Sequence, residues 1–250
     1  MRVALANLQL SVADMPDVDR AIHCALPIIF ASEESPAFPG IKGTCTALRY
    51  RNECVFVTAA HVVQGNDCNT AIYVPLGFSA SEARCQIKQI LTPRAADPNA
   101  PTDLAMMRAS AAPDFVGGES SAFPVPPFAR MDLVPPKALF AVSGYPLDCA
   151  DRNCVDYDAR TILFGKQMAL GTYDSRSPMN GLHMLRLSTA DTGGPNGFSG
   201  GPVFRLLHDQ ETRTWTPAFA GIVTNGGPEC VHFIDAEYVV AFLSTALSAP

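Results

Sequence analysis

The chain has 250 residues, of which 48% are hydrophobic and 17% charged, and a formal net charge of −6 at pH 7. This composition is typical of a globular protein with enough apolar residues for a sizeable core. No run of Lys and Arg is present, and the acidic balance argues against a nucleic-acid partner or an anionic membrane surface. No segment reaches the roughly 18–20 apolar residues that a membrane-spanning helix needs.

Residues 1–13 imitate a secretory signal, with one Arg before an apolar run, but Asn7 and Gln9 interrupt that run. We favour an ordinary N-terminal strand or helix, and a cytoplasmic location slightly over a secreted or periplasmic one. The eight cysteines form no Cys-x-x-Cys motif, so we expect no metal site. Cys149 and Cys154 flank a short polar loop and are the best candidates for a disulfide.

The elements predicted along the chain are mostly short strands. A helical pattern over residues 12–22 is reduced to a short turn by Pro16. From Gly43 onward, apolar and β-branched runs bounded by Gly, Pro and Asn predict strands. These cover residues 44–50, 54–58, 71–76, 84–91, 104–108, 138–143, 160–170, 183–188, 202–207, 218–224 and 231–234.

Two segments, one near the middle of the chain and one at its end, depart from this pattern. Residues 109–136 are rich in proline and predict a loop, of the kind that links two β-domains. Residues 236–247 predict a helix that begins after Asp235, a suitable N-cap, and places its apolar residues largely on one face. Short strands at this density indicate an all-β sandwich or barrel.

The segment Gly197-Phe198-Ser199-Gly200-Gly201 is the first candidate for chemistry. A nucleophilic serine needs an exposed hydroxyl on a tight turn, with backbone N–H groups nearby to hold an oxyanion. Glycine at position 197 permits an unusual backbone conformation, and the N–H groups of Gly197 and Ser199 are the expected donors. Taken alone, the segment fits a glycine-rich turn between strands equally well.

His61 and Asp103 supply the two other groups that such a serine requires. His61 directly follows an apolar strand, and Asp103 stands at the entrance of another. A histidine can take the proton of a serine, and a partly buried aspartate can orient the imidazole ring. Asp97 is a competing carboxylate, but Pro98 follows it rather than an apolar strand.

His61, Asp103 and Ser199 occur in this order within Thr-Ala-Ala-His, Asp-Leu-Ala and Gly-x-Ser-Gly-Gly-Pro, and the set resembles the trypsin/chymotrypsin superfamily of serine proteases. The resemblance extends from about Gly43 to Leu247. It implies an all-β, chymotrypsin-like fold of two six-stranded antiparallel β-barrels with a C-terminal α-helix. The expected parts are an N-terminal segment packing on the barrels (1–42), a first barrel with His61 and Asp103 (43–125) and a second barrel with Ser199 and the helix (126–250).

The same resemblance implies which residues bind substrate. Thr224, Asn225 and Gly226 match the strand that pairs with the substrate backbone, and Gly193 matches the base of the specificity pocket. Members that cleave after Arg or Lys carry an acid at that base, so we do not expect this specificity, although Asp191 leaves the point open. His232 is close enough in sequence to reach the pocket, but a structural or surface role is the interpretation we favour.

Phe198 replaces the Asp that, in members activated by N-terminal cleavage, pairs with the new N-terminus. We therefore do not expect trypsin-type activation. The Asp-Leu-Ala motif and Pro202-Val203 look most like bacterial HtrA-like protease domains, here without a PDZ domain, or like glutamyl endopeptidases.

The sequence thus predicts a serine endopeptidase that forms an acyl-enzyme through Ser199, His61 and Asp103 and uses no cofactor. Its expected partners are protein or peptide substrates, and an activating partner or one dedicated substrate is a further expectation. The alternative is a catalytically silent or partner-activated trypsin-like fold that serves as a binding or scaffold module. An esterase of the α/β-hydrolase kind fits poorly, because its residues follow the order Ser, Asp or Glu, His.

Overall fold

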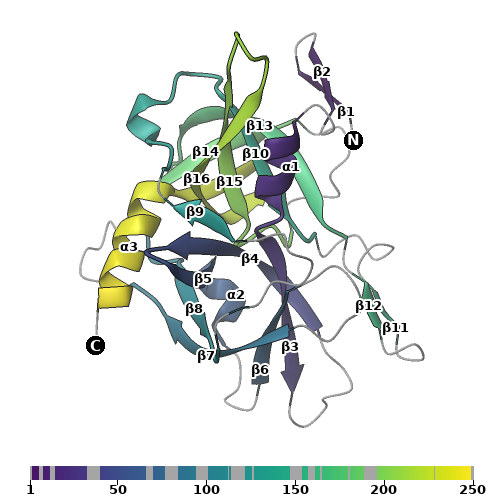
Figure 1. Cartoon of the computed structure of the whole chain (residues 1–250), viewed down its shortest axis with the longest axis vertical. Helices are drawn as coiled ribbons and strands as arrows, with labels where there is room; N and C mark the ends of the chain where they lie inside the picture. The colour runs from purple at the N-terminus through teal and green to yellow at the C-terminus, as the bar shows by residue number, and fades with distance from the viewer. Residues whose placement is uncertain are drawn as a thin grey trace.

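The computed structural model describes residues 2–5, 8–11, 15–32, 40–65, 70–76, 84–93, 101–111, 113, 122–125, 127–146, 154–156, 161–163, 165–179, 181–188, 196–227 and 229–248. Most of these residues lie in strands that form two barrels, one below the other in Figure 1. The predicted chymotrypsin-like architecture, with two closed six-stranded antiparallel barrels and a C-terminal helix, is confirmed.

The first barrel lies in the lower half of Figure 1 and closes through pairing of its first two strands. Its strands are β3 (Ala25–Ser32), β4 (Gly40–Tyr50), β5 (Glu53–Thr58), β6 (Thr70–Pro75), β7 (Arg84–Leu91) and β8 (Ala105–Ala109). Around the barrel they follow the order β3-β4-β5-β8-β7-β6. The sequence pattern does not predict β3, which lies before Gly43 and contains Pro27.

A short additional strand, β9 (Phe123–Val125), pairs parallel to β4. It lies within the proline-rich segment that the sequence predicts as a loop, so that prediction is wrong for these three residues. These residues form a strand because they pair with a segment more than seventy positions away, and the local sequence pattern cannot predict such a pairing.

The second barrel repeats the connectivity of the first. Its strands are β10 (Leu139–Gly144), β13 (Gln167–Arg176), β14 (Leu182–Leu187), β15 (Pro202–His208), β16 (Trp215–Gly227) and β17 (Cys230–Asp235). They follow the order β10-β13-β14-β17-β16-β15, in which strand ranks correspond one to one with those of the first barrel. The two halves are therefore structural repeats, although their sequences show no repeat.

Two hairpins lie apart from the barrels: β1 (Arg2–Leu5) with β2 (Leu8–Ser11), and β11 (Cys154–Asp156) with β12 (Thr161–Leu163). The predicted Cys149–Cys154 disulfide falls outside the described side chains. The cysteines whose side chains are described are free: Cys24, Cys45, Cys54, Cys85 and Cys230.

The helices lie at the barrel surfaces. In α1 (Pro16–Ile22), Pro16 occupies the first turn, where its missing N–H costs nothing, so it begins the helix instead of breaking it. The short helix α2 (Ala60–Val63) follows β5, and η2 (Met131–Leu133) precedes β10. The predicted last helix is α3 (Ala236–Ser248), and its N-cap Asp235 accepts the Tyr238 N–H at 2.8 Å.

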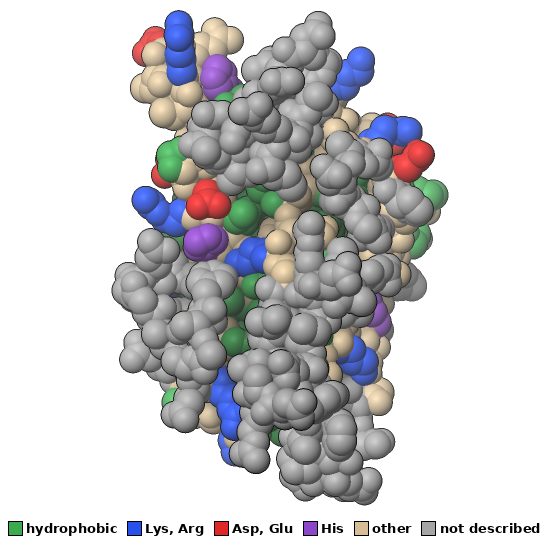
Figure 2. All heavy atoms as spheres, turned by 90° about the vertical axis from the view of Figure 1, so that its right-hand side faces the viewer, with side chains coloured by type: hydrophobic (Ala, Val, Ile, Leu, Met, Phe, Trp, Pro, Cys, Tyr) green, Lys and Arg blue, Asp and Glu red, His purple; other side chains and the backbone are tan. Residues whose placement is uncertain are grey.

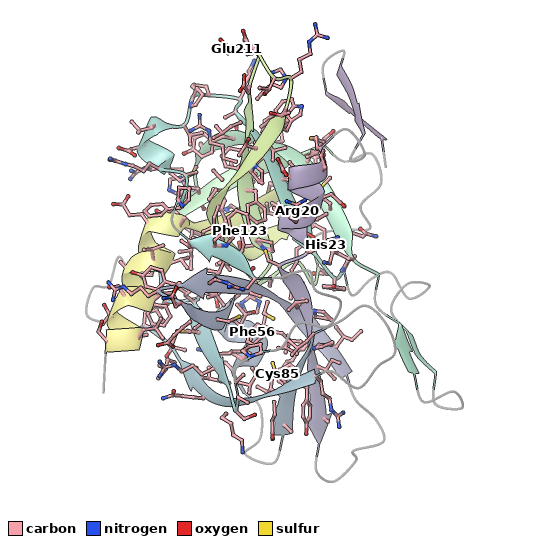
Figure 3. All side chains as sticks on the ribbon, viewed as in Figure 1. Arg20, His23, Phe56, Cys85, Phe123 and Glu211 are labelled. Atoms are coloured by element: carbon pink, nitrogen blue, oxygen red, sulfur yellow. The ribbon has the colours of Figure 1, made fainter. Side chains whose placement is uncertain are left out.

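Apolar packing joins the two barrels into one body. One buried cluster fills the first barrel and includes Phe56 and Cys85, both visible inside it in Figure 3. A second cluster fills the other barrel, and a third lies between them and contains Leu48 and Leu104 from the first barrel with Phe204 and Ile222 from the second. The third cluster thus packs the two barrels tightly against each other.

The surface carries charges of both signs. On the face in Figure 2, the described Lys and Arg side chains are scattered and do not gather in one patch. Among the described residues, no helix is long and apolar enough to cross a membrane.

Candidate active site

His61 and Asp103 meet at the edge of the first barrel. His61 lies in α2, and Asp103 directly precedes the buried Leu104 and strand β8. The ring Nδ1 of His61 lies 2.8 Å from Asp103 Oδ2 and 3.1 Å from Oδ1, and the backbone N–H of His61 donates to Oδ1 at 2.9 Å. The carboxylate therefore holds both the ring and the backbone of His61, which fixes where the ring points.

The electrostatics of this pair favour a charged aspartate. The hydrogen bond with Asp103 raises the pKa of His61 above 6.5, against the opposing effect of partial burial. Burial alone would raise the pKa of Asp103, but hydrogen bonds from the His61 ring and backbone outweigh it, and the net pKa is lowered. An ionised Asp103 accepts the Nδ1 hydrogen, which leaves Nε2 of neutral His61 as a proton acceptor.

Ser199 lies on a tight turn of the second barrel. The Gly201 N–H donates to the Phe198 carbonyl at 2.7 Å, and the Gly200 N–H donates to the Val223 carbonyl at 2.7 Å. Gly197 has φ = +93° and Gly200 φ = +88°, both in the region that favours glycine. The predicted glycine-rich turn therefore exists, and two of its glycines have conformations that other residues rarely adopt.

The Ser199 turn and the segment that carries His61 both lie against the start of β4, at Gly43 and Thr44. The N–H of Thr44 donates to the Ser199 carbonyl at 3.1 Å. A Cβ placed on Gly43 would lie 2.9 Å from Val62 Cγ1 and 3.4 Å from the Ser199 carbonyl oxygen. Val62 is the neighbour of His61, so Gly43 stands between the His61 segment and the Ser199 turn.

The hydroxyl of Ser199 donates to the carbonyl of Thr224 at 2.7 Å. Thr224 occupies a register shift of β16 between Val223 and Asn225, and such a bulge turns a carbonyl out of the regular ladder. Because a hydroxyl has one hydrogen, this bond must break before Ser199 can give its proton to His61. Hydrogen bonds between catalytic groups are often absent or long without substrate and form in the complex.

The other predicted substrate-binding residues extend from Thr224 along β16. Asn225 and Gly226 are exposed and pair with β17 on one side, while the described pairing with β15 ends at Ile222. Within the described residues, the edge of β16 beyond Val223 therefore has no strand partner. Gly193 lies outside the described residues, as do Asp97 and Asp191.

Residues 43–209 match the family model of the trypsin-like peptidase domain. The chain belongs to the trypsin-like peptidases. The match covers more than half of the chain and includes His61, Asp103 and Ser199. No curated protein matches the chain.

This trypsin-like peptidase contains residues near Ser199 that the sequence did not single out. Thr44, Thr46 and Thr58 are fully buried, and their hydroxyls bond to backbone carbonyls of Gly197, Gly200 and Thr44. Two of these bonds cross from the first barrel to the turn that carries Ser199. Threonines at alternate positions of an otherwise apolar strand were the available signal, because a buried hydroxyl needs a partner.

A second histidine–aspartate pair lies inside the second barrel. His183 Nε2 is 3.5 Å from Asp235 Oδ2, and its Nδ1 is 3.1 Å from the Tyr173 hydroxyl. The His183 ring also packs on Phe233, with ring centroids 5.4 Å apart. Both ring nitrogens of His183 therefore have a polar partner within this trypsin-like peptidase.

His232 lies beside the predicted substrate-binding residues: its carbonyl accepts the Thr224 hydroxyl at 3.3 Å, and it pairs with Asn225 between β16 and β17. His232 bonds through Nδ1 to Ser177 at 2.8 Å, and burial lowers its pKa. A cavity of about 280 Å³ has Arg20 and Phe123, both labelled in Figure 3, in its walls but none of the candidate site residues. Among the described residues, no group of three or more His, Cys, Asp or Glu side chains could hold a metal ion.

Proposed function

We propose that this trypsin-like peptidase is a serine endopeptidase with Ser199 as nucleophile, His61 as general base and Asp103 as the group that orients it. The observation that carries the proposal is the double contact of Asp103 with the ring and the backbone N–H of His61, on a segment that lies against Gly43 as the Ser199 turn does. A carboxylate that only neutralised charge would not need to hold the backbone as well.

The reaction follows from these contacts. Substrate displaces the Ser199 hydroxyl from the Thr224 carbonyl, and Oγ attacks the peptide carbonyl while its proton passes to Nε2 of His61. Asp103 stabilises the imidazolium without taking the proton. The N–H groups of Gly197 and Ser199 stabilise the oxyanion, His61 returns the proton to the leaving amine, and water then hydrolyses the acyl-enzyme with His61 again as base.

Substrate recognition is proposed to use the open edge of β16. An extended peptide would add a strand beside Thr224, Asn225 and Gly226, and its main-chain hydrogen bonds would not depend on its sequence. The family resemblance assigns Gly193 to the pocket base, and a glycine offers no charge for an Arg or Lys side chain. Cleavage after Arg or Lys is therefore not part of the proposal.

Apolar packing supports a Ser199 turn that needs no N-terminal ion pair. Phe198 is fully buried and belongs to the core cluster of the second barrel. Burial of a phenylalanine side chain stabilises by about 2–3 kcal/mol, which anchors the turn without a charged partner. We propose that the peptidase is competent without N-terminal cleavage.

The test is hydrolysis of fluorescently labelled casein by the wild-type chain and by Ser199→Ala and His61→Ala, followed by mass spectrometry of the products. The proposal expects peptide products from the wild type alone. Folded wild-type protein without activity would contradict it, as would equal activity in Ser199→Ala. Products cut mainly after Arg or Lys would contradict the proposed role of Gly193.

A second candidate function is a silent or partner-activated binding module, and the bond from the Ser199 hydroxyl to the Thr224 carbonyl favours it. If that bond persists with substrate present, Ser199 keeps its proton. Casein would then bind without being cut, and binding would be equal in the wild type and Ser199→Ala.

A further inference from the structure

The peptide unit that joins Gly197 to Phe198 lies between the two expected oxyanion donors. The two flanking peptide units carry the N–H groups of Gly197 and Ser199. The dihedral angles ψ of Gly197 and φ of Phe198, on either side of the 197–198 unit, set how these flanking units are oriented relative to each other, and so whether the two N–H groups converge on one point. Such convergence of neighbouring N–H groups is what makes an anion-binding concavity of the backbone. At φ = +93°, Gly197 itself offers little resistance to rotation, because glycine populates both signs of φ.

The side chain of Thr44 contacts this peptide unit from the first barrel. Its hydroxyl donates to the Gly197 carbonyl at 2.6 Å and accepts the backbone N–H of Tyr145 at 3.0 Å. A backbone N–H can only donate, so the single hydrogen of the hydroxyl is directed to Gly197. Thr44 is fully buried, and the loss of its hydroxyl would remove a hydrogen-bond partner from the Gly197 carbonyl inside the protein.

We propose that Thr44 is a positioning residue for the oxyanion site: its hydroxyl holds the 197–198 peptide so that the Gly197 and Ser199 N–H groups face the same point. The proposal rests on the proposed serine endopeptidase function. Thr44 belongs to β4, whereas the peptide it holds belongs to the second barrel. The oxyanion site therefore depends on the contact between the barrels, and not on the Ser199 turn alone.

Thr46 provides a matched control within the same strand. It is also fully buried, lies two positions along β4, and its hydroxyl donates to the Gly200 carbonyl at 2.9 Å. Gly200 follows Ser199, and the peptide unit of its carbonyl lies outside the stretch of backbone between the two expected oxyanion donors. Valine at either position removes one buried hydroxyl and keeps the shape, but only Thr44→Val releases the 197–198 peptide.

The experiment measures covalent inactivation by a fluorophosphonate probe. During attack by Ser199, the phosphoryl oxygen of the probe would accept hydrogen bonds from the N–H groups of Gly197 and Ser199. We expect Thr44→Val to lower kinact by at least about tenfold, less than the 10²–10³-fold effect of deleting a donor outright. KI should stay within about threefold, because only the attack step uses the oxyanion site. Thr44→Ser keeps the hydroxyl and should restore kinact. Thr46→Val should lose about as much thermal stability as Thr44→Val, with kinact close to that of the wild type.

Three results would overturn the inference: a wild-type kinact in folded Thr44→Val, an equal loss in Thr46→Val, or no recovery in Thr44→Ser. If Thr44→Val does not fold, Thr44→Cys replaces it, since its thiol is a weak donor of similar size, and it must show the lowered kinact. A reactive wild type with an equally reactive Thr44 variant contradicts this inference alone. A folded but unreactive wild type contradicts the proposed function, and the inference with it.

Discussion

The two histidine–aspartate pairs within the described residues differ in which ring nitrogens have partners. His61 bonds to Asp103 through Nδ1, which leaves Nε2 outside that contact, and its side chain is 51% exposed. His183 has a side chain 9% exposed, with Tyr173 at one nitrogen and Asp235 at the other. A general base needs one nitrogen oriented and the other accessible. Only His61 meets both conditions, which shows that a histidine–carboxylate contact alone does not mark a catalytic site.

The largest contrast is expected between alanine variants of the two histidines. His61→Ala removes the base and should lower kcat/KM on casein by at least about 10⁴-fold, with little change in melting temperature. His183→Ala leaves a cavity beside Phe233 and should lower the free energy of unfolding by about 3 kcal/mol, with kcat/KM nearly unchanged well below the melting temperature. A folded His183→Ala that is as inactive as His61→Ala would remove the distinction between the pairs.

Asp103 and Asp235 should also differ in what their replacement by asparagine, a residue of nearly the same shape, does to activity and stability. Asp103→Asn should lower kcat by about 10⁴-fold, because the amide can donate to Nδ1 and so favours the wrong tautomer of His61. Asp235→Asn should cost at most about 1 kcal/mol of stability, since asparagine also caps a helix and only the contact with His183 is weakened. Steady-state kinetics and thermal unfolding of both variants check this, and near-normal kcat in Asp103→Asn would count against the orienting role of Asp103.

The pH dependence of activity should follow the ionisation of His61. Attack needs neutral His61, and its pKa is raised by the bond to Asp103, so kcat/KM should rise with pH through a value above 6.5 and be lost in acid. Asp103→Asn removes the main cause of the raised pKa, and the acid limb of its residual activity should move to lower pH. Tyr173→Phe, which alters only the surroundings of His183, is the control. An acid limb that moves in Tyr173→Phe but not in Asp103→Asn would contradict the assignment.

The smallest effect is expected from the hydroxyl of Tyr173. Tyr173→Phe removes its bond to His183 Nδ1 and should cost about 1 kcal/mol, or about 2–4 °C in melting temperature. Differential scanning fluorimetry measures the shift, with Tyr73→Phe on the first barrel as control. A shift no larger than that of the control would mean that the Tyr173 bond does not hold His183.

The sequence was most informative where the local pattern and the chemistry coincide. His61 follows an apolar strand, Asp103 precedes one and Ser199 lies on a glycine turn, so short motifs were enough to select them as candidates. The two barrels were predicted from the resemblance of these motifs to the trypsin/chymotrypsin superfamily. Most strands from β4 onward follow their apolar and β-branched runs, and α3 follows its cap and its apolar face. The pattern did not predict β9 or β11, and the single strand predicted over residues 160–170 is wrong, because β12 and β13 are separate strands there.

The features that the sequence did not predict depend on contacts between distant segments. The sequence pattern did not predict β3, because proline is uncommon inside strands and Pro27 lies within this one. Pro16 begins α1, because a proline in the first turn of a helix needs no N–H partner. The bond from Thr44 to Gly197 joins residues 153 positions apart, and the bulge at Thr224 is visible only in the pairing of β16 with β17. No short motif encodes either feature.

The most direct test of the account is the mass of the intact protein after treatment with a fluorophosphonate, with the modified peptide then identified. We predict one adduct on Ser199 in the wild type and no adduct in Ser199→Ala. The adduct should form much more slowly in His61→Ala and at the wild-type rate in folded His183→Ala. Folded wild-type protein without an adduct, or an adduct on another residue that persists in Ser199→Ala, would contradict the claim that His61 and Asp103 activate Ser199.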